Sequence, residues 1–125
     1  MTAIAITGAN GFVGRNLIWR LREAGFTDIV QIDRNADDDV IAGQLREIGL
    51  LIHLAGVNRT DDPSEFHAGN AGYTARICRL AAAAERPPAL FYASTIRAVD
   101  DSDYGRSKRA AEDHVAAYGK ATGAP

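Results

Sequence analysis

Short apolar runs alternate with longer segments of helical periodicity along the whole chain. Residues 2–7 (TAIAIT) are nearly continuously apolar, and further strand-like runs cover residues 28–33, 50–54 and 89–94. An apolar run without polar alternation is typical of a strand that is buried on both faces, as in a parallel sheet. Parallel strands need crossover connections, and the helical segments between the runs supply them. The sequence therefore predicts an α/β fold around a parallel sheet.

The segments between the predicted strands carry the apolar spacing and the end signals of helices. Residues 12–24 place Val13, Leu17 and Leu21 on one face, and Gly25 follows as a C-terminal cap. We expect the other helices at residues 37–48, from about 65 to 85, and at 104–122. The second of these three stops before two prolines, and the last begins with Asp-Ser-Asp capping chemistry and ends at a glycine.

Length and composition are those of an ordinary globular domain. The 125 residues match one domain, and 46% apolar with 24% charged residues argues against a disordered or disulfide-rich chain. Fourteen basic and sixteen acidic residues give a net charge of −2, so no overall field attracts nucleic acid or an anionic membrane. The single cysteine, a start unlike a signal peptide and the lack of an apolar stretch of roughly 18 residues favour a cytoplasmic location.

The chain is short for a doubly wound sheet. Four strands are predicted where such folds have about six, and the sequence stops just past a helix, where the alternation calls for another strand. We therefore expect residues 1–125 to form a single domain that is a fragment of a longer protein.

A glycine-rich turn follows the first strand. The sequence TGANGFVG places Gly8, Gly11 and Gly14 between this strand and the first helix. A pyrophosphate approaches the backbone closely only where side chains are absent. The first helical residues, Phe12 and Val13, then present amides to phosphate oxygens at the positive end of the helix dipole. Glycine spacing alone is a weak signal, but its place between strand and helix predicts a dinucleotide-binding turn.

Asp33 lies at the carboxyl end of the second strand, nineteen residues beyond Gly14. A carboxylate there can accept both ribose hydroxyls of the adenosine half of a dinucleotide and would repel a 2′-phosphate. The neighbouring Arg34 points the other way, because an arginine in this loop can pair with a 2′-phosphate. We favour NAD as the cofactor and keep NADP as the alternative. An aspartate that merely ends a strand is the plainer interpretation of Asp33.

Tyr104 and Lys108 are four residues apart on a predicted helix, so their side chains share one face. A free phenol, with a pKa of about 10, is a weak base near neutral pH, and a nearby ammonium group favours its phenolate. The pair can therefore donate and accept a proton.

Ser94 and Thr95 end the fourth strand, on the side of the sheet where α/β proteins bind ligands, and either hydroxyl can bind a substrate oxygen. A surface contact for the Tyr104–Lys108 pair and turn hydrogen bonds for Ser94 and Thr95 are the plainer alternatives.

Four features have now been described: the glycine-rich turn, Asp33, the Ser94–Thr95 pair and the Tyr104–Lys108 pair. Together and in this order along the chain, they resemble the extended short-chain dehydrogenase/reductase family, the NAD-dependent epimerases and dehydratases of nucleotide sugars. The resemblance covers the whole chain and includes the Asn70-centred GNAGYT stretch and the residues Leu54, Ala55 and Gly56, where the family lines the cofactor. The HLAGVNR sequence and the short step from Thr95 to Tyr104 look most like the capsular-polysaccharide enzymes. Those enzymes reduce a UDP-amino sugar, usually with NADPH.

The resemblance implies a Rossmann-like, doubly wound parallel sheet, here truncated to about four strands with helices on both faces. It implies a nucleotide-sugar oxidoreductase or epimerase. In such an enzyme Tyr104 is the general acid/base and, together with Lys108, a cofactor-binding residue; Lys108 holds the nicotinamide ribose, and Thr95 is the catalytic hydroxyl, with Ser94 beside it. It also implies a UDP-sugar substrate and a homodimer formed through the helices at 65–85 and 104–122. The exposed edge of the fourth strand is a second route to association.

Two other function classes remain open at this point. A dinucleotide-sensing module would bind the cofactor without turnover, and the presence of Tyr104, Lys108 and Thr95 argues against it. A purely structural domain is disfavoured by the glycine turn with Asp33. The segment that builds the family's sugar-binding domain is absent from this sequence, so the sugar is implied by resemblance alone.

The remaining candidate ligands are interpreted as structural. No two of the three histidines, His53, His67 and His114, have the spacing of metal ligands, so we expect no metal site. Cys78 lies among apolar residues of a predicted helix and is interpreted as a small core residue.

Overall fold

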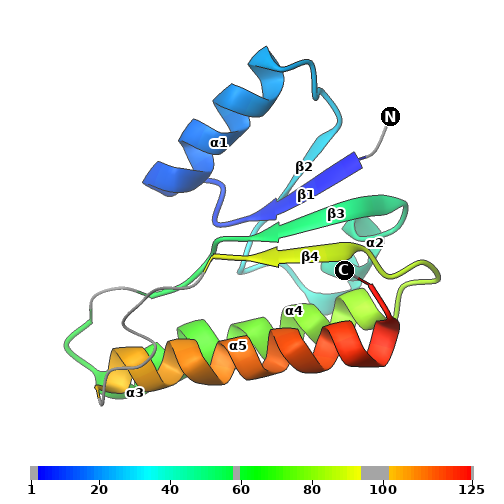
Figure 1. Cartoon of the computed structure of the whole chain (residues 1–125). Coiled ribbons are helices and arrows are strands. Elements are labelled where there is room, and N and C mark those ends of the chain that lie inside the picture. Colours follow the sequence, from blue (N-terminus) through cyan, green and yellow to red (C-terminus); the bar gives the residue numbers. More distant parts are fainter. Residues whose placement is uncertain (1–2, 58–59, 94–101, 125) are drawn as a thin grey trace.

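The computed structural model describes residues 3–57, 60–93 and 102–124, and the strands in these ranges form one parallel sheet (Figure 1). The strands are β1 (Ala3–Thr7), β2 (Ile29–Ile32), β3 (Ile48–His53) and β4 (Ala89–Tyr92), in the spatial order β2-β1-β3-β4. All three neighbouring pairs run parallel, so the carboxyl ends of the strands meet at one edge of the sheet. The predicted Rossmann-like α/β class with four strands is confirmed.

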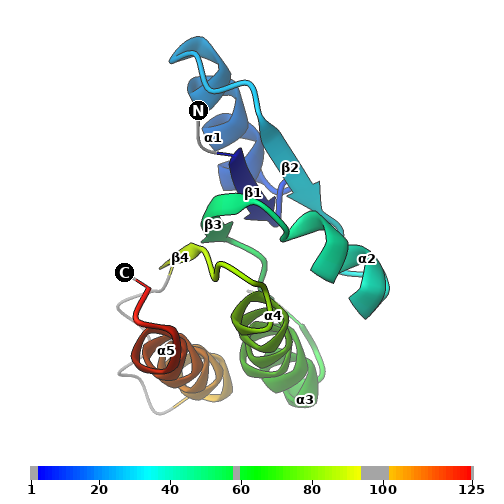
Figure 2. The same ribbon diagram turned by 90° about the vertical axis from the view of Figure 1, so that its right-hand side faces the viewer.

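Helices cover both faces of this sheet (Figure 2). Helix α1 (Phe12–Glu23) lies on one face, and α2 (Asp38–Gln44), α4 (Tyr73–Ala82) and α5 (Asp103–Thr122) lie on the other. The alternation of side chains along β1 explains the two layers. Ile4 and Ile6 pack with Ile18 of α1, whereas Ala5 packs in the second core, beneath α2 and α4.

The helix expected at residues 37–48 is shorter than predicted. It ends at Gln44, and Ile48 already belongs to β3, where it pairs with Ala3. Glu47 adopts a left-handed conformation (φ 59°), which turns the chain from the helix into the strand. Ile48 is nevertheless buried in the same core as Ile41 and Leu45, so the apolar pattern identified the core and missed the change of element.

The long helix expected from about 65 to 85 consists of three consecutive segments. It begins with α3 (Pro63–Phe66), continues through the π-helical turn η1 (His67–Gly72) and ends with α4 at Ala82. A π-turn widens the helix by one residue and is frequent at functional sites. The segment η1 buries Gly69, Asn70 and Ala71.

The predicted end signals of α1 and α5 are confirmed. The Ser102 hydroxyl accepts the Gly105 amide at 3.0 Å and caps α5, and Gly123 (φ +70°) ends it in the left-handed conformation. Gly25 (φ +98°) follows α1. None of the described helices is both long and apolar enough to cross a membrane.

Candidate functional site

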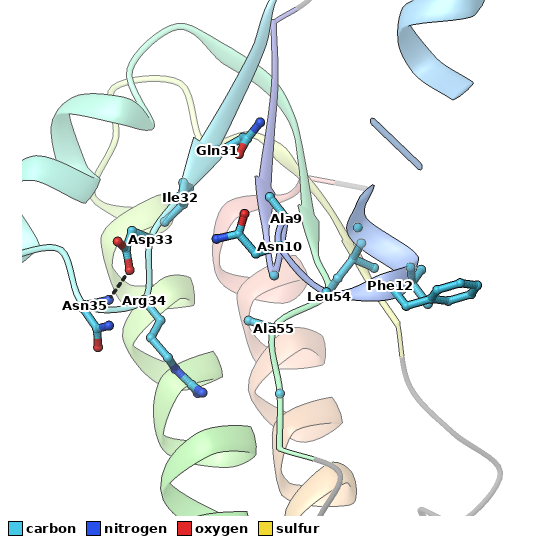
Figure 3. A pocket seen from close by; sticks show the side chains of 15 residues that line it. Ala9, Asn10, Phe12, Gln31, Ile32, Asp33, Arg34, Asn35, Leu54 and Ala55 are labelled. Carbon is cyan, nitrogen blue, oxygen red and sulfur yellow. Dashed lines mark hydrogen bonds between the residues drawn. The ribbon is translucent and has the colours of Figure 1, made fainter. Parts of the chain in front are cut away.

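A cleft of about 610 Å³ opens at the carboxyl ends of β1, β2 and β3 (Figure 3). Its walls come from the glycine turn after β1, from the loop after β2 and from the chain that follows β3. The predicted cofactor-binding residues outside α5 all line it: Gly8, Gly11, Phe12, Val13, Gly14, Asp33, Arg34, Leu54, Ala55 and Gly56. The structure therefore brings together residues that are up to 48 positions apart in the sequence.

The glycine turn has no room for side chains at two positions. A Cβ on Gly8 (φ +71°) would lie 2.7 Å from the Ala55 backbone nitrogen, and a Cβ on Gly14 would lie 2.2 Å from the Gly8 carbonyl oxygen. The turn is closed by the Gly11 amide, which donates to the Gly8 carbonyl at 3.2 Å. Absence of these side chains lets β1, α1 and the chain after β3 meet closely and leaves backbone at the surface of the cleft.

The N-terminus of α1 opens into this cleft and carries no counter-charge of its own. Gly11 is its N-cap, so no side chain caps the helix, and its first turn contains no acidic residue. The first-turn amides and the positive end of the helix dipole together favour an anion. The exposed Phe12 side chain points away from the Asp33 side of the cleft (Figure 3), so it is the backbone here that faces the cleft.

Asp33 and Arg34 stand at the opposite rim of the cleft. One oxygen of the Asp33 carboxylate accepts the Asn35 amide at 2.8 Å, and Asp33 is exposed and lines the cleft. The Arg34 guanidinium donates to the Gly69 carbonyl at 3.1 Å and lies over the Tyr73 ring, 5.0 Å from its centroid. The two side chains point in different directions (Figure 3).

Arg76 of α4 fixes the loop that follows β2. It donates to the carbonyl oxygens of Arg34 (3.2 Å) and Ala36 (2.7 Å) and to the Asp38 carboxylate (2.5 Å). Arg79 adds a second ion pair to Asp38 at 3.0 Å. Hydrogen bonds from these two guanidinium groups lower the pKa of Asp38. The position of Asp33 is therefore set from α4 across the face of the sheet.

A buried polar chain orders the other wall of the cleft. The Thr7 hydroxyl accepts the amides of Leu54 and Ala55, each at 3.1 Å, and contacts His53 Nδ1 at 2.6 Å. Because the Thr7 oxygen accepts two amides, its own hydrogen goes to Nδ1, and His53 Nε2 donates to Thr74 at 2.8 Å. Burial, with the nearby charges of Lys108 and Arg34, lowers the pKa of His53 from 6.5 to about 3, so its ring is neutral.

Asn70 connects this wall to helix α5. Its amide oxygen accepts the Val57 amide (2.8 Å), and its amide nitrogen donates to the Val57 carbonyl (3.0 Å) and to the Ser107 hydroxyl (2.9 Å). Ser107 in turn donates to the Tyr104 carbonyl at 2.7 Å. The buried Asn70 on η1 thus sets the distance between the cleft and the Tyr104–Lys108 helix face.

Lys108 is buried beside the cleft. Its ammonium group donates to the Ala93 carbonyl at 3.2 Å and lies 4.7 Å from the centroid of the Tyr92 ring. A Cβ on Gly56 would lie 3.7 Å from this nitrogen, so the cleft wall and the ammonium group are neighbours. Burial lowers the pKa of Lys108. Tyr104, one turn earlier, is half-buried and packs edge-on against Phe66.

Several residues that shape this site were not among the predicted site residues. Thr7, His53 and Thr74 form the buried chain, Asn70 and Ser107 link it to α5, and Arg76 holds the Asp33 loop. One signal was available: Thr7 and His53 are polar residues at the ends of otherwise apolar strands, and they are direct partners in the β1–β3 register. Ser94 and Thr95, the predicted substrate-binding hydroxyls, lie outside the described residues.

The remaining sequence interpretations concern metals and the cysteine. In the parts of the chain that the structure describes, no three His, Cys, Asp or Glu side chains gather as metal ligands. Cys78 lies on α4 and is buried in the hydrophobic core of the protein, where burial raises the pKa of its thiol to about 11.

The cleft fits a dinucleotide on structural grounds. Two glycines stand where a Cβ would collide with backbone, an uncapped helix N-terminus faces the cleft, and a carboxylate lies at the far rim. Backbone amides suit a pyrophosphate and the carboxylate suits ribose hydroxyls. Fold and cleft together define a Rossmann-like α/β protein with a nucleotide-type site.

Comparison with known proteins identifies the family. The model of the NAD dependent epimerase/dehydratase family matches residues 4–125, and the chain belongs to this family. It is 41% identical over 122 residues to the UDP-2-acetamido-2,6-beta-L-arabino-hexul-4-ose reductase of Pseudomonas aeruginosa, a match that covers 98% of this chain and 33% of the reductase. The chain thus spans about a third of this curated relative.

Solved structures show the same fold. The capsular polysaccharide assembling protein CapF of Staphylococcus aureus superposes with a TM-score of 0.81 at 32% identity, over 98% of this chain and 33% of CapF. The UDP-glucuronic acid 4-epimerase of Bacillus cereus in complex with NAD has a TM-score of 0.81 at 18% identity, over 99% of this chain and 54% of the epimerase. The second likeness supports the fold alone.

Proposed function

We propose that this chain is the cofactor-binding domain of an NAD-dependent nucleotide-sugar oxidoreductase. The observation that carries the proposal is the continuous structure from the glycine-lined cleft, through Gly56 and Asn70, to the Tyr104–Lys108 face of α5. A site that only binds a dinucleotide has no need of a tyrosine and a buried lysine at its inner end. Membership of an NAD-dependent family supports the same function.

Each wall of the cleft has a role in this proposal. The amides after Gly11 bind the pyrophosphate, the Asp33 carboxylate accepts the adenosine ribose hydroxyls, and the chain at Leu54, Ala55 and Gly56 lies along the middle of the dinucleotide. NAD is favoured over NADP because Asp33 would repel a 2′-phosphate.

The catalytic roles fall on α5 and on the segment before it. When bound, the cofactor supplies hydride exchange with a carbon of the substrate. Tyr104 transfers the matching proton to or from the sugar oxygen, and the Lys108 ammonium binds the nicotinamide ribose. We assign the substrate hydroxyl contact to Thr95, with Ser94 beside it, from the sequence pattern.

The substrate is inferred from the relatives. The 41% identical reductase acts, by its name, on a UDP-linked keto sugar, so we propose a UDP-sugar whose carbonyl is reduced or formed. The cleft walls described above are all assigned to the cofactor. We therefore propose that the sugar is bound by residues corresponding to the part of the longer reductase that this chain does not match.

Calorimetry combined with an absorbance assay tests this function. We expect the chain to bind one NADH. In a longer protein that joins this chain to the proposed sugar-binding part, with a UDP-4-keto sugar present, Tyr104→Phe should oxidise NADH at least about a hundredfold more slowly than the wild type, because a proton donor is lost. The variant's Kd for NADH should stay within twofold, roughly, since the substitution removes one hydroxyl and keeps the Tyr104 ring position and Lys108.

The two parts of the proposal fail separately. Absence of NADH binding by a chain with a cooperative melt contradicts the cofactor assignment. NADH binding by the chain, with a longer protein that is inactive or that oxidises NADH equally fast in the wild type and Tyr104→Phe, contradicts the catalytic assignment and leaves a binding module.

We also propose a cytoplasmic homodimer. Helices α4 and α5 lie side by side on the outer surface of the sheet (Figure 2), within the two segments expected to form the interface, and β4 is an edge strand of the described sheet. Sedimentation equilibrium at high concentration should give the mass of two chains. A single monomeric species at all concentrations would contradict the dimer.

A further inference from the structure

Arg34 directly follows the carboxylate that is proposed to bind the adenosine ribose, yet its guanidinium is engaged elsewhere. It donates to the Gly69 carbonyl of η1 at 3.1 Å, and its central carbon lies 5.0 Å from the centroid of the Tyr73 ring. The Asp33 carboxylate instead accepts a hydrogen bond from the Asn35 amide. Two adjacent residues of opposite charge are thereby turned apart (Figure 3).

The surface that holds Arg34 is closely packed. The Tyr73 ring is only 6% exposed and packs against the buried His53 ring, with 5.7 Å between the centroids. Gly69 lacks a side chain where a Cβ would lie 2.2 Å from a Val57 methyl carbon and 3.4 Å from the Arg34 guanidinium. The Tyr73 hydroxyl is buried and has no hydrogen-bond partner among the described residues. Tyr73 therefore contacts Arg34 through the face of its ring.

The main chain of Arg34 is held as well. Its carbonyl accepts a hydrogen bond from Arg76 at 3.2 Å, and Arg76 is itself paired with Asp38. The loop therefore cannot easily swing to bring the guanidinium beside Asp33. Before Arg34 can bind a phosphate on the ribose, its guanidinium has to lose two interactions. These are the cation–π contact with the Tyr73 ring and the charge-assisted hydrogen bond to the Gly69 carbonyl.

We propose that Tyr73, together with the Gly69 carbonyl, restrains Arg34 and thereby makes the site selective for NAD over NADP. Tyr73 is a positioning residue in this inference, because it acts on the cofactor through Arg34. With Arg34 retained on η1, the Asp33 carboxylate alone meets the ribose edge and repels a 2′-phosphate. The inference rests on the proposed function, since it needs a dinucleotide in the cleft.

Calorimetric titration with NADH and with NADPH tests the restraint. We expect the wild type to bind NADH more tightly than NADPH. Tyr73→Leu should shift the ratio of the two dissociation constants toward NADPH by roughly fivefold, because the loss of the aromatic face frees Arg34. Tyr73→Phe is the matched control, since it keeps the face and removes only the unpartnered hydroxyl, and its ratio should equal that of the wild type.

Arg34→Ala completes the experiment and does not depend on the folding of a core variant, because Arg34 lies on an exposed loop. In the otherwise wild-type chain it should change the NADPH affinity by less than about twofold, since the guanidinium is held away. Combined with Tyr73→Leu it should abolish the gain in NADPH binding. A loss of about tenfold or more in NADPH affinity in Arg34→Ala alone, or an unchanged ratio in a folded Tyr73→Leu, overturns the inference. A wild type that binds neither nucleotide overturns the proposed function instead.

Discussion

The free energy of unfolding should fall by about 3 kcal/mol between pH 7 and pH 4.5 because of one residue, His53. The His53 ring is fully buried between Thr7 and Thr74, and the charges nearest to it are those of Lys108 and Arg34. Burial lowers its pKa from 6.5 to about 3. The unfolded chain therefore takes up a proton at His53 below pH 6.5 that the folded chain refuses, so acid favours unfolding until the pH reaches about 3.

Urea unfolding at several pH values measures this effect. His53→Gln keeps a hydrogen-bond acceptor and a donor but does not titrate, so its stability should be lower at pH 7 and should decline much less toward pH 4.5. His114→Gln is the matched control for the substitution itself, because His114 is exposed on α5 and lies outside the buried Thr7–His53–Thr74 chain. Equal pH dependence of the wild type and His53→Gln would contradict a buried, neutral His53.

Gly14→Ala should weaken NADH binding at least about a hundredfold. The added Cβ would lie 2.2 Å from the Gly8 carbonyl oxygen and 2.9 Å from the Ala9 Cα, and both are backbone atoms of the turn. The turn can admit the methyl group only if α1 moves away from β1, which displaces the amides proposed to bind the pyrophosphate. The same overpacking should cost roughly 1–3 kcal/mol of stability.

Gly43→Ala is the matched control for this prediction. Gly43 lies in α2, and a Cβ there would meet no atom within 4 Å. Alanine in a helix should raise stability by roughly 0.5–1 kcal/mol and leave NADH binding unchanged. Thermal melting and calorimetry on both variants give the two readouts. Wild-type NADH affinity in Gly14→Ala would show that the geometry of the turn is not what binds the cofactor.

Local sequence signals were sufficient for the layers of the fold and for most of the cleft. The apolar runs identified all four strands, and the position of the glycines after the first of them located the turn. Asp33 and the Leu54–Gly56 stretch reach the same cleft because parallel strands end at one edge. The end of α2 was misplaced because Ile48 continues the helical spacing of Ile41 and Leu45, while the chain reverses at Glu47.

The polar connections of the site could not be predicted in the same way. Asn70 reaches Val57 and Ser107, which are 13 and 37 residues away, and Arg76 reaches Asp38 across 38 residues. Such contacts depend on how η1 and α4 sit against α5 and the loop after β2. Helical periodicity also does not reveal the π-turn, because the segment HAGNAG consists mostly of small residues and carries little apolar pattern.

The central claim is that the cleft at the carboxyl ends of the strands binds the dinucleotide. Titration of the ¹⁵N-labelled chain with NADH, followed by amide chemical shifts, tests it most directly. We predict saturable shifts at residues 8–14, 31–35 and 54–56, which line the cleft. Saturation without shifts at these amides, or shifts centred on the cavity at the opposite end of the sheet around Ala3, Arg46 and Pro88, would contradict the account.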